Sequence, residues 1–265
     1  MDWKVWNNIR PKLEELLLEQ RARNVEQAYI ERVERRSQQI AEHFEAYIGT
    51  VSLTDAEMGL MPNTCDVKQL PILMALARRR DAYGNVSRRQ FLAVVDQVML
   101  VDVEGYKARA KEVLVDAMRR RFQDRHDDLR GISVDDALGR CWAYFDCRFD
   151  CPTRPAVRQQ TFLEMHAHWR AVHPNDSWMA QKARRYYEGV RVSDGTYCAH
   201  SSFADIARQV LTTVDIPLDT PPSQLDDFVR TGRLYCTCGD PDMPLPNELG
   251  WITFVSLYTR LPTPT

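Results

Sequence analysis

The first half of the chain carries apolar residues at the spacing of an amphipathic helix. After Pro11, apolar side chains recur mainly at helical intervals with Glu, Arg and Gln between them, at Leu13, Leu16, Leu17, Val25, Tyr29, Val33, Ile40 and Phe44. This pattern predicts a helix of about 35 residues. We expect it to begin near Pro11, because proline is tolerated at the first helical position.

Shorter helices are predicted after this segment. Turn-forming residues occupy Gly49–Pro62. Within them, Thr54 followed by Glu57 matches a capping box, which predicts one short turn of helix. A further helix is expected over Val67–Arg80, with Pro71 in its first turns.

A second long helix is predicted after a turn at Asp81–Asn85. Ser87 is a suitable N-cap, and apolar residues recur at helical spacing as far as Met118, with Gly105 as the expected position of a bend. Two long helices joined by a shorter one predict an antiparallel hairpin or an extended coiled coil. Residues 1–128 are therefore expected to form a helical arm.

Residues 130–265 differ in composition from the arm, because six of the seven cysteines and four of the six histidines lie there. Short helices are expected at 134–140, 160–172, 177–189, 201–213, 223–231 and 248–259. Short strands are expected at Trp142–Phe145 and Arg233–Tyr235. The predicted fold class is mainly α, with a long N-terminal helical arm and a small α+β region. That region contains two zinc-finger-like elements, 141–174 and 232–260.

The composition of the chain argues against several classes of function. The net charge of -2 gives no global attraction to nucleic acid or to a membrane. No apolar run approaches the roughly 18 residues that a membrane-spanning helix needs, and the N-terminus does not resemble a signal peptide. The odd number of cysteines is unlike a secreted disulfide scaffold. We therefore expect an intracellular protein, cytoplasmic or nuclear, with no membrane partner.

The segment from Cys147 to His173 carries the most specific chemical signal. Cys147 and Cys151 have the spacing of a zinc knuckle, and the predicted helix after them carries three histidines. His166 and His173 share a helix face but stand about 10 Å apart along the axis, which is too far for one metal. His168 and His173 fit the H-x3–5-H rule. The predicted ligands of a structural zinc ion are therefore Cys147, Cys151, His168 and His173, although the 16 residues between Cys151 and His168 exceed the usual gap.

Alternatives to this assignment stay open. Buried free cysteines beside surface histidines on an ordinary helix would give the same spacing. A weaker second ligand set is formed by Cys198, His200, Cys236 and Cys238. Because no cysteine or histidine follows Cys238, a degenerate finger held together by apolar packing would also explain that element.

Sequence signatures of catalysis are missing. The chain contains no P-loop, G-x-G-x-x-G, G-x-S-x-G or H-E-x-x-H motif. Cys198 and His200 lie near Asp194, but residues two positions apart do not normally face each other, so they are a poor nucleophile and base pair. We expect a protein that is not an enzyme.

Several segments together resemble a known family. The resemblance is carried by Asp2-Trp3-Lys4-Val5-Trp6 with Pro11-Lys12-Leu13, by Tyr144-Phe145-Asp146-Cys147, by Phe162-Leu163-Glu164-Met165-His166-Ala167-His168, and by Arg233-Leu234-Tyr235-Cys236-Thr237-Cys238-Gly239 with Trp251. They look like the C-terminal region of mushroom-type fungal F-box proteins. The resemblance implies degenerate C2H2-like finger elements at Cys147/Cys151/His168 and at Cys236/Cys238. No F-box is evident before Trp3, so we expect a truncated or diverged relative.

These features together predict a non-catalytic, adaptor-like protein whose partner is another protein. Self-association through the N-terminal helices is a second predicted interaction. One alternative is a zinc-finger protein that binds nucleic acid, which the absence of a basic stripe on residues 160–172 disfavours. The other alternative is a helical scaffold that binds no metal.

Overall fold

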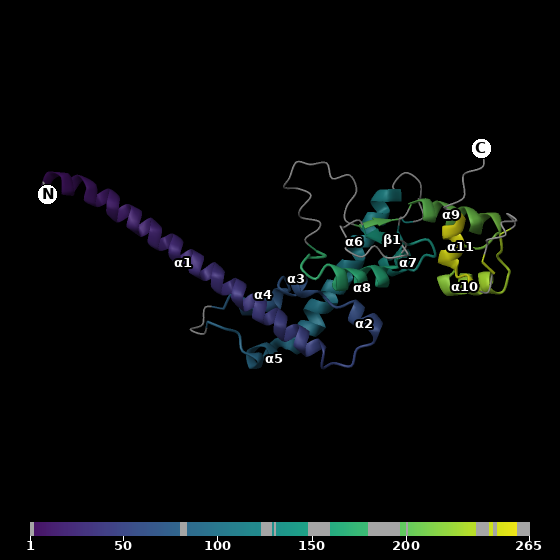
Figure 1. Cartoon of the computed structure of the whole chain (residues 1–265), viewed down its shortest axis with the longest axis horizontal. Helices are drawn as coiled ribbons and strands as arrows, with labels where there is room; N and C mark the ends of the chain where they lie inside the picture. The colour runs from purple at the N-terminus through teal and green to yellow at the C-terminus, as the bar shows by residue number, and fades with distance from the viewer. Residues whose placement is uncertain are drawn as a thin grey trace. The chain divides into compact units, whose positions relative to one another are not determined.

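The structure, a computed structural model, describes residues 3–79, 84–122, 129, 131–147, 160–179, 197–199, 201–236, 244–245 and 248–258. These residues are mainly helical, which confirms the predicted class (Figure 1).

By its contacts the chain divides into unit 1, residues 1–52 with 62–104, and unit 2, residues 53–61 with 105–265. This division differs from the predicted border near residue 129, and the predicted arm, 1–128, and Cys/His-containing region, 130–265, stay predictions. No helix in the described ranges is long and apolar enough to cross a membrane.

Helix α1 spans Trp3–Ile48 and is 46 residues long, with Pro11 in its interior. The predicted start at Pro11 is therefore wrong. Trp6 and Ile9 precede Leu13 at intervals of three and four, so they extend the same apolar stripe towards the N-terminus. The tolerance of proline at a first helical position predicted the start at Pro11, whereas the apolar spacing continues to Trp6.

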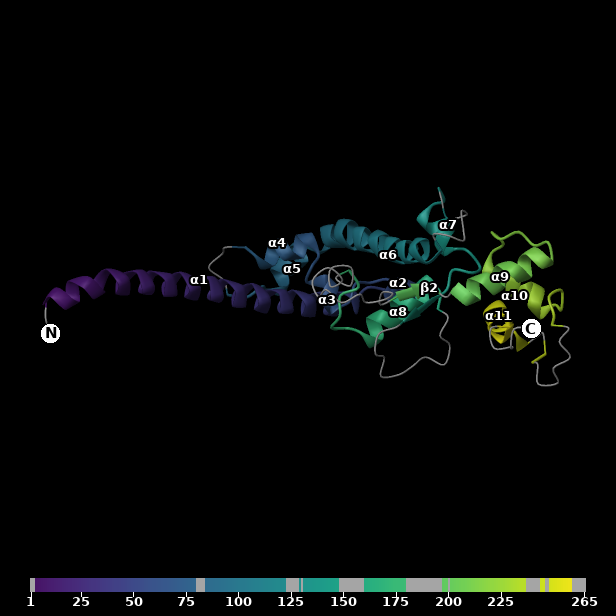
Figure 2. The same ribbon diagram turned by 90° about the horizontal axis from the view of Figure 1, so that it is seen from above.

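The C-terminal third of α1 builds the core of unit 1. It packs against α3 (Thr64–Val67), α4 (Pro71–Ala77) and α5 (Arg88–Gln97) (Figures 1 and 2). The buried apolar side chains of this unit include Ile40, Ala41, Phe44, Ile48, Val67, Leu70, Leu73, Leu76, Phe91, Val95, Val98 and Val103. Arg36 is also buried, and its Nη1 donates a hydrogen bond to the carbonyl of Arg79 at 2.8 Å.

The helix predicted over Val67–Arg80 is divided into α3 and α4, so that prediction was wrong in its boundaries. Leu70 adopts an extended conformation, with φ -64° and ψ 128°. A residue that precedes proline is driven out of the helical region, and Pro71 then begins a new helix. By contrast, α2 (Asp55–Gly59) carries the predicted capping box between Thr54 and Glu57.

The second helical stretch begins as predicted, because Ser87 caps α5 and forms a capping box with Gln90. A π-helix, η1 (Val98–Val103), then precedes α6 (Glu104–Phe122), so the irregularity lies just before Gly105. The π-helix carries the buried side chain of Asp102. Its Oδ2 accepts a hydrogen bond from the backbone N–H of Ile72 at 2.7 Å. Asp102 thereby caps α4, for which Leu70 provides no side-chain cap.

Unit 2 contains short helices close to the predicted positions. These are α7 (Val134–Leu138), α8 (Phe162–Val172), α9 (Ser201–Thr213), α10 (Pro222–Arg230) and α11 (Trp251–Tyr258). The helix predicted at 177–189 lies largely outside the described residues, and 177–179 are not helical. Helix α11 packs against both α9 and α10 (Figure 2).

The strands differ from the prediction. In the described ranges, β1 (Phe145–Cys147) pairs antiparallel with β2 (Tyr197–Ala199), with Cys147 opposite Tyr197. The strand expected at Trp142–Phe145 therefore overlaps β1 only at Phe145. The strand expected at Arg233–Tyr235 does not form.

The reason lies at Gly232, which has φ +70° and ends α10. The backbone N–H groups of Arg233 and Leu234 both donate to the carbonyl of Phe228, at 2.8 and 3.0 Å. The chain folds back onto α10 in this way, and those donors are not available to a neighbouring strand.

Aromatic side chains dominate the core of unit 2. Phe122 of α6 meets Trp142 edge to face, with ring centroids 5.7 Å apart. The fully buried indole of Trp251 donates a hydrogen bond to the carbonyl of Cys141 at 2.7 Å, across 110 residues of sequence. These contacts hold α6, the segment before β1 and α11 in one packed unit.

Candidate metal centre

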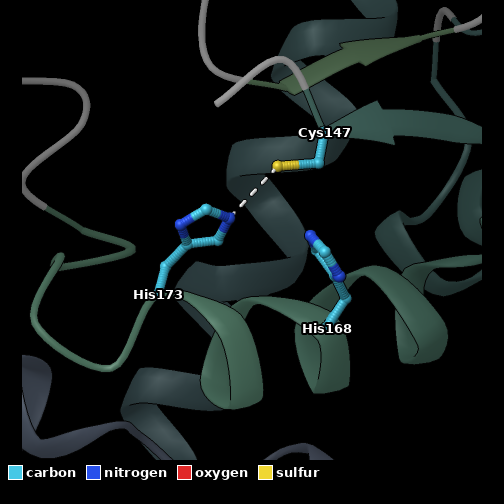
Figure 3. Close-up of side chains that lie close together, drawn as sticks. All are labelled: Cys147, His168 and His173. Atoms are coloured by element: carbon cyan, nitrogen blue, oxygen red, sulfur yellow. Dashed lines mark hydrogen bonds between the residues drawn. The ribbon is translucent and has the colours of Figure 1, made fainter. Parts of the chain in front are cut away.

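Three of the four predicted zinc ligands come together in unit 2. One ligand atom each from Cys147, His168 and His173 lies within 4.8 Å of the others. Figure 3 shows both imidazole rings turned towards the Cys147 sulfur. Cys147 Sγ and His173 Nε2 are 3.5 Å apart.

Cys147 is placed by the end of strand β1. Phe145, two residues earlier, is fully buried and lies opposite Ala199 of β2 in the sheet register. On its other side, Phe145 exchanges two backbone hydrogen bonds with Gln160, at 2.8 and 3.0 Å. Gln160 stands just before α8, so the strand that carries Cys147 is bonded directly to the approach of the helix that carries His168.

His168 is placed by α8. A capping box fixes the start of this helix, because the Thr161 side chain accepts from the Glu164 N–H while Glu164 accepts from the Thr161 N–H. Met165 and Trp169 are buried on one face. His168, beside Trp169 in sequence, is half-buried and lies at the edge of that face.

His173 reaches the cluster because α8 ends before it. Five positions along an uninterrupted helix rotate a side chain by about 140°, which would turn His173 away from His168. His173 instead has φ -122° and ψ 53°, outside the helical region. The two imidazole centroids are then 5.5 Å apart. Trp169 packs on the His173 ring at 4.5 Å and donates its indole N–H to the Asp176 carbonyl at 3.0 Å, which fixes the turn.

Burial favours the neutral form of both imidazoles. The pKa of His168 is lowered mainly by burial and further by the neighbouring His173. Burial also lowers the pKa of His173, and the Asp176 carboxylate partly offsets that effect. A neutral imidazole has a free lone pair, which is the form that binds a metal ion.

His166, the histidine excluded from the predicted set, is a core residue. It is 1% exposed, and its ring nitrogens contact Gly59 O at 2.7 Å and the Tyr106 hydroxyl at 2.9 Å. Its role is to join α2, α6 and α8 rather than to bind a metal.

Four of the predicted ligands have side chains outside the part of the chain that the structure describes. Cys151, His200 and Cys238 lie outside the described residues, and for Cys198 the structure describes the backbone of β2 only. Cys236 is half-buried and lines a small apolar cavity with Val229, Leu234, Leu249 and Phe254, among other residues. The second ligand set therefore stays a prediction.

The donor set suits a transition metal. One thiolate and two imidazoles are ligands that zinc prefers, and a structural zinc site takes four of them in a tetrahedron. Cys147, His168 and His173 could hold a metal ion between them. The sequence indicated these residues through their spacing, but gave no sign that Trp169 would support His173 or that β2 would pair with β1.

Comparison of this chain with known proteins finds no match. No family model, no curated protein and no solved structure matches this chain. The resemblance to fungal F-box proteins therefore stays an expectation from the sequence.

Proposed function

We propose that this chain is a non-catalytic protein that binds another protein, and that Cys147, His168 and His173 hold a structural zinc ion in its second unit. The observation that carries the proposal is the convergence of these three side chains within 4.8 Å, from a strand and from the end of a helix. Cys151 is proposed as the fourth ligand, because its spacing from Cys147 is that of a zinc knuckle.

A structural role for the metal is supported by what the ligands are attached to. Cys147 follows the buried Phe145, and His173 lies against the buried Trp169. A metal that joins these side chains would link β1 to the C-terminal end of α8. The free energy of metal binding would then contribute directly to the stability of unit 2.

Protein binding is supported by the exposed surface of α1. Every residue from Ile9 to Glu31 is exposed, and this stretch includes leucines that are about 60% exposed, Leu16 at 61% and Leu17 at 60%. Exposed apolar side chains that line one helix are typical of a surface that another protein covers. The resemblance to adaptor-type F-box proteins agrees with this proposal.

Nucleic-acid binding is the second candidate function, and α8 argues against it. A zinc finger reads bases through basic or amide side chains on the outer face of its helix. The exposed residues of α8 are Leu163, Glu164 and Ala171, none of them basic.

A scaffold that binds no metal is the third candidate, since Cys147 and His173 at 3.5 Å could form a simple hydrogen bond.

The metal proposal is tested by metal analysis of the purified 265-residue chain. We expect one zinc ion per chain by inductively coupled plasma mass spectrometry. Cys147→Ala and His173→Ala should each lower the zinc content at least about tenfold. Cys151→Ala should do the same if Cys151 completes the tetrahedron, and should have no effect if another donor does.

Matched control variants separate ligand loss from general damage. Cys65→Ala and His43→Gln remove a cysteine and a histidine from unit 1, and both should retain full zinc content. Zinc retained in both Cys147→Ala and His173→Ala would overturn the metal proposal.

Partner capture before and after nuclease treatment tests the binding proposal, and capture that depends on intact nucleic acid would favour the second candidate, nucleic-acid binding.

A further inference from the structure

The connection between α4 and α5 in unit 1 is fastened along one edge of α1. The fully buried Arg36 donates from Nη1 to the carbonyl of Arg79 at 2.8 Å. Further along the helix, Gln39 Oε1 accepts from the N–H of Val86 at 2.9 Å, and His43 Nε2 lies 3.0 Å from the Val86 carbonyl. These contacts hold both ends of the connection against successive turns of α1.

This packing gathers exposed arginines from three segments, which we call the arginine patch and define as Arg35, Arg79 and Arg88. A Cβ atom at Gly84 would lie 4.0 Å from Arg35 Nη2, so this guanidinium reaches the connection. Arg88 stands three positions before Phe91, whose ring centroid is 5.9 Å from that of His43. Residues three apart on a helix share a face, so Arg88 lies on the side of α5 that meets α1.

The positive charge of the arginine patch is not neutralised within the described ranges. None of its three guanidinium groups forms an ion pair with another residue that the structure describes. Arg80 and Asp81, the charged residues of the connection outside those ranges, cancel each other in charge. A guanidinium group presents paired N–H donors that match the two oxygens of a carboxylate or a phosphate. The patch is therefore suited to an anion of either kind.

Acidic residues limit the length of that anion. Glu31 and Glu42 lie about one turn before and two turns after Arg35, on the same side of α1. They are about 16 Å apart along the helix axis, which is the length of about five extended residues. A nucleic acid or a membrane surface continues beyond this span and would meet both carboxylates, whereas a short peptide would not.

We propose that the arginine patch binds a short acidic segment of the partner protein, through carboxylate or phosphate groups. This inference rests on the proposed protein-binding function and adds the chemistry of the partner. Clusters of arginine bind acidic and phosphorylated peptides through charge-assisted hydrogen bonds. The whole chain has a net charge of -2, so the attraction is local to this part of unit 1.

Binding of labelled peptides to the 265-residue chain tests the proposal. The probes are fluorescein-labelled pentapeptides of glutamate, of alternating phosphoserine and glycine, and of glutamine, followed by fluorescence anisotropy at about 50 mM salt. We expect one or both acidic peptides to bind, which separates carboxylate from phosphate, and the glutamine peptide not to bind. The triple variant Arg35→Gln, Arg79→Gln and Arg88→Gln should weaken the binding about tenfold.

A second triple variant, Arg109→Gln, Arg119→Gln and Arg230→Gln, is the matched control. It removes the same charge from exposed positions of unit 2 and should bind like the wild type. Circular dichroism at 222 nm should show that both variants keep their helices. If neither acidic peptide binds, or if the two triple variants lose binding equally, the proposal is overturned.

Single-stranded DNA and phosphatidylserine vesicles are tested in the same way. If either binds more tightly than both acidic peptides, and the patch variant loses that binding, the occupant is a nucleic acid or a membrane and the proposal is overturned. Partner capture by the wild type is a separate measurement, so a failure of the arginine patch can be distinguished from a failure of the protein-binding proposal.

Discussion

Nε2 of His166 lies 2.9 Å from the hydroxyl of Tyr106, although 60 residues separate them in the sequence. Nδ1 of the same ring lies 2.7 Å from the Gly59 carbonyl, which can only accept a hydrogen bond. Nδ1 therefore carries the proton, and in the neutral ring Nε2 accepts from the tyrosine hydroxyl. One buried imidazole thus joins α6 to α2 through α8.

Removal of the tyrosine hydroxyl should destabilise the protein. In Tyr106→Phe, Nε2 of His166 would be a buried acceptor without its donor, which costs about 1–2 kcal/mol of unfolding free energy. Urea unfolding of the variant and the wild type measures this difference. Tyr235→Phe is the control, since Tyr235 is 63% exposed and its change should be close to zero. An equal effect in both variants would contradict the role given to the Tyr106 hydroxyl.

Stability should fall as the pH is lowered through the titration of His166. Burial lowers the pKa of His166 from 6.5 to about 4. Below pH 6.5 the unfolded chain therefore binds a proton that the folded chain does not, until the pH approaches 4. The wild type should lose up to about 3 kcal/mol relative to His166→Gln across this window. Urea unfolding from pH 7.5 to 4 measures the difference, and other histidines cancel because both proteins contain them. A difference that does not change with pH would contradict the assignment.

The buried carboxylate of Asp102 should stabilise unit 1 through α4. Asp102→Ala removes the acceptor of the Ile72 N–H and should cost about 1–2 kcal/mol. Asp102→Asn keeps an acceptor oxygen and should cost less. Asp96→Ala makes the same change at an exposed position of α5 and should be nearly neutral. If Asp102→Ala proves as mild as Asp96→Ala in thermal unfolding, the capping role is refuted.

Gly59 should be required for the close packing of α2 on α8. A Cβ atom at Gly59 would lie 3.1 Å from the Cβ of Ala167, closer than ordinary contact. Gly59→Ala should therefore destabilise the protein by about 1 kcal/mol. Gly49→Ala is the control, because its nearest neighbour would be 3.5 Å away, and it should be neutral or slightly stabilising. Because Ala167→Gly inside α8 has its own cost, the test is the coupling: Gly59→Ala should cost less in an Ala167→Gly background than in the wild type, and an equal cost in both would place the strain elsewhere.

The sequence predicted best what is encoded locally. The capping box at Thr54 and the N-cap at Ser87 depend only on nearby residues, and both form. Helices with clear apolar periods, such as α8 and α9, appear close to the expected residues. His168 and His173 were also predicted from their spacing, but the two rings meet because α8 ends before His173, which the spacing alone did not predict.

The errors arose where distant residues or single backbone conformations decide the structure. The strand expected at Arg233–Tyr235 was replaced by a turn because Gly232 adopts a positive φ and returns the chain to α10. β1 pairs with β2, more than 40 residues further along, and no local pattern specifies such a partner. The cap that Asp102 gives to Ile72 spans 30 residues and was likewise invisible in the sequence.

X-ray absorption at the zinc K-edge of the zinc-loaded 265-residue chain tests the metal centre most directly, because it reports the atoms bound to the metal. A zinc ion bound as proposed should have sulfur at about 2.3 Å and at least two imidazole nitrogens at about 2.0–2.1 Å. Cys147→Ala should lose one sulfur, and the control Cys65→Ala should give the wild-type spectrum. A first shell of oxygen and nitrogen without sulfur, or a shell that Cys147→Ala leaves unchanged, would contradict a zinc centre built on Cys147, His168 and His173.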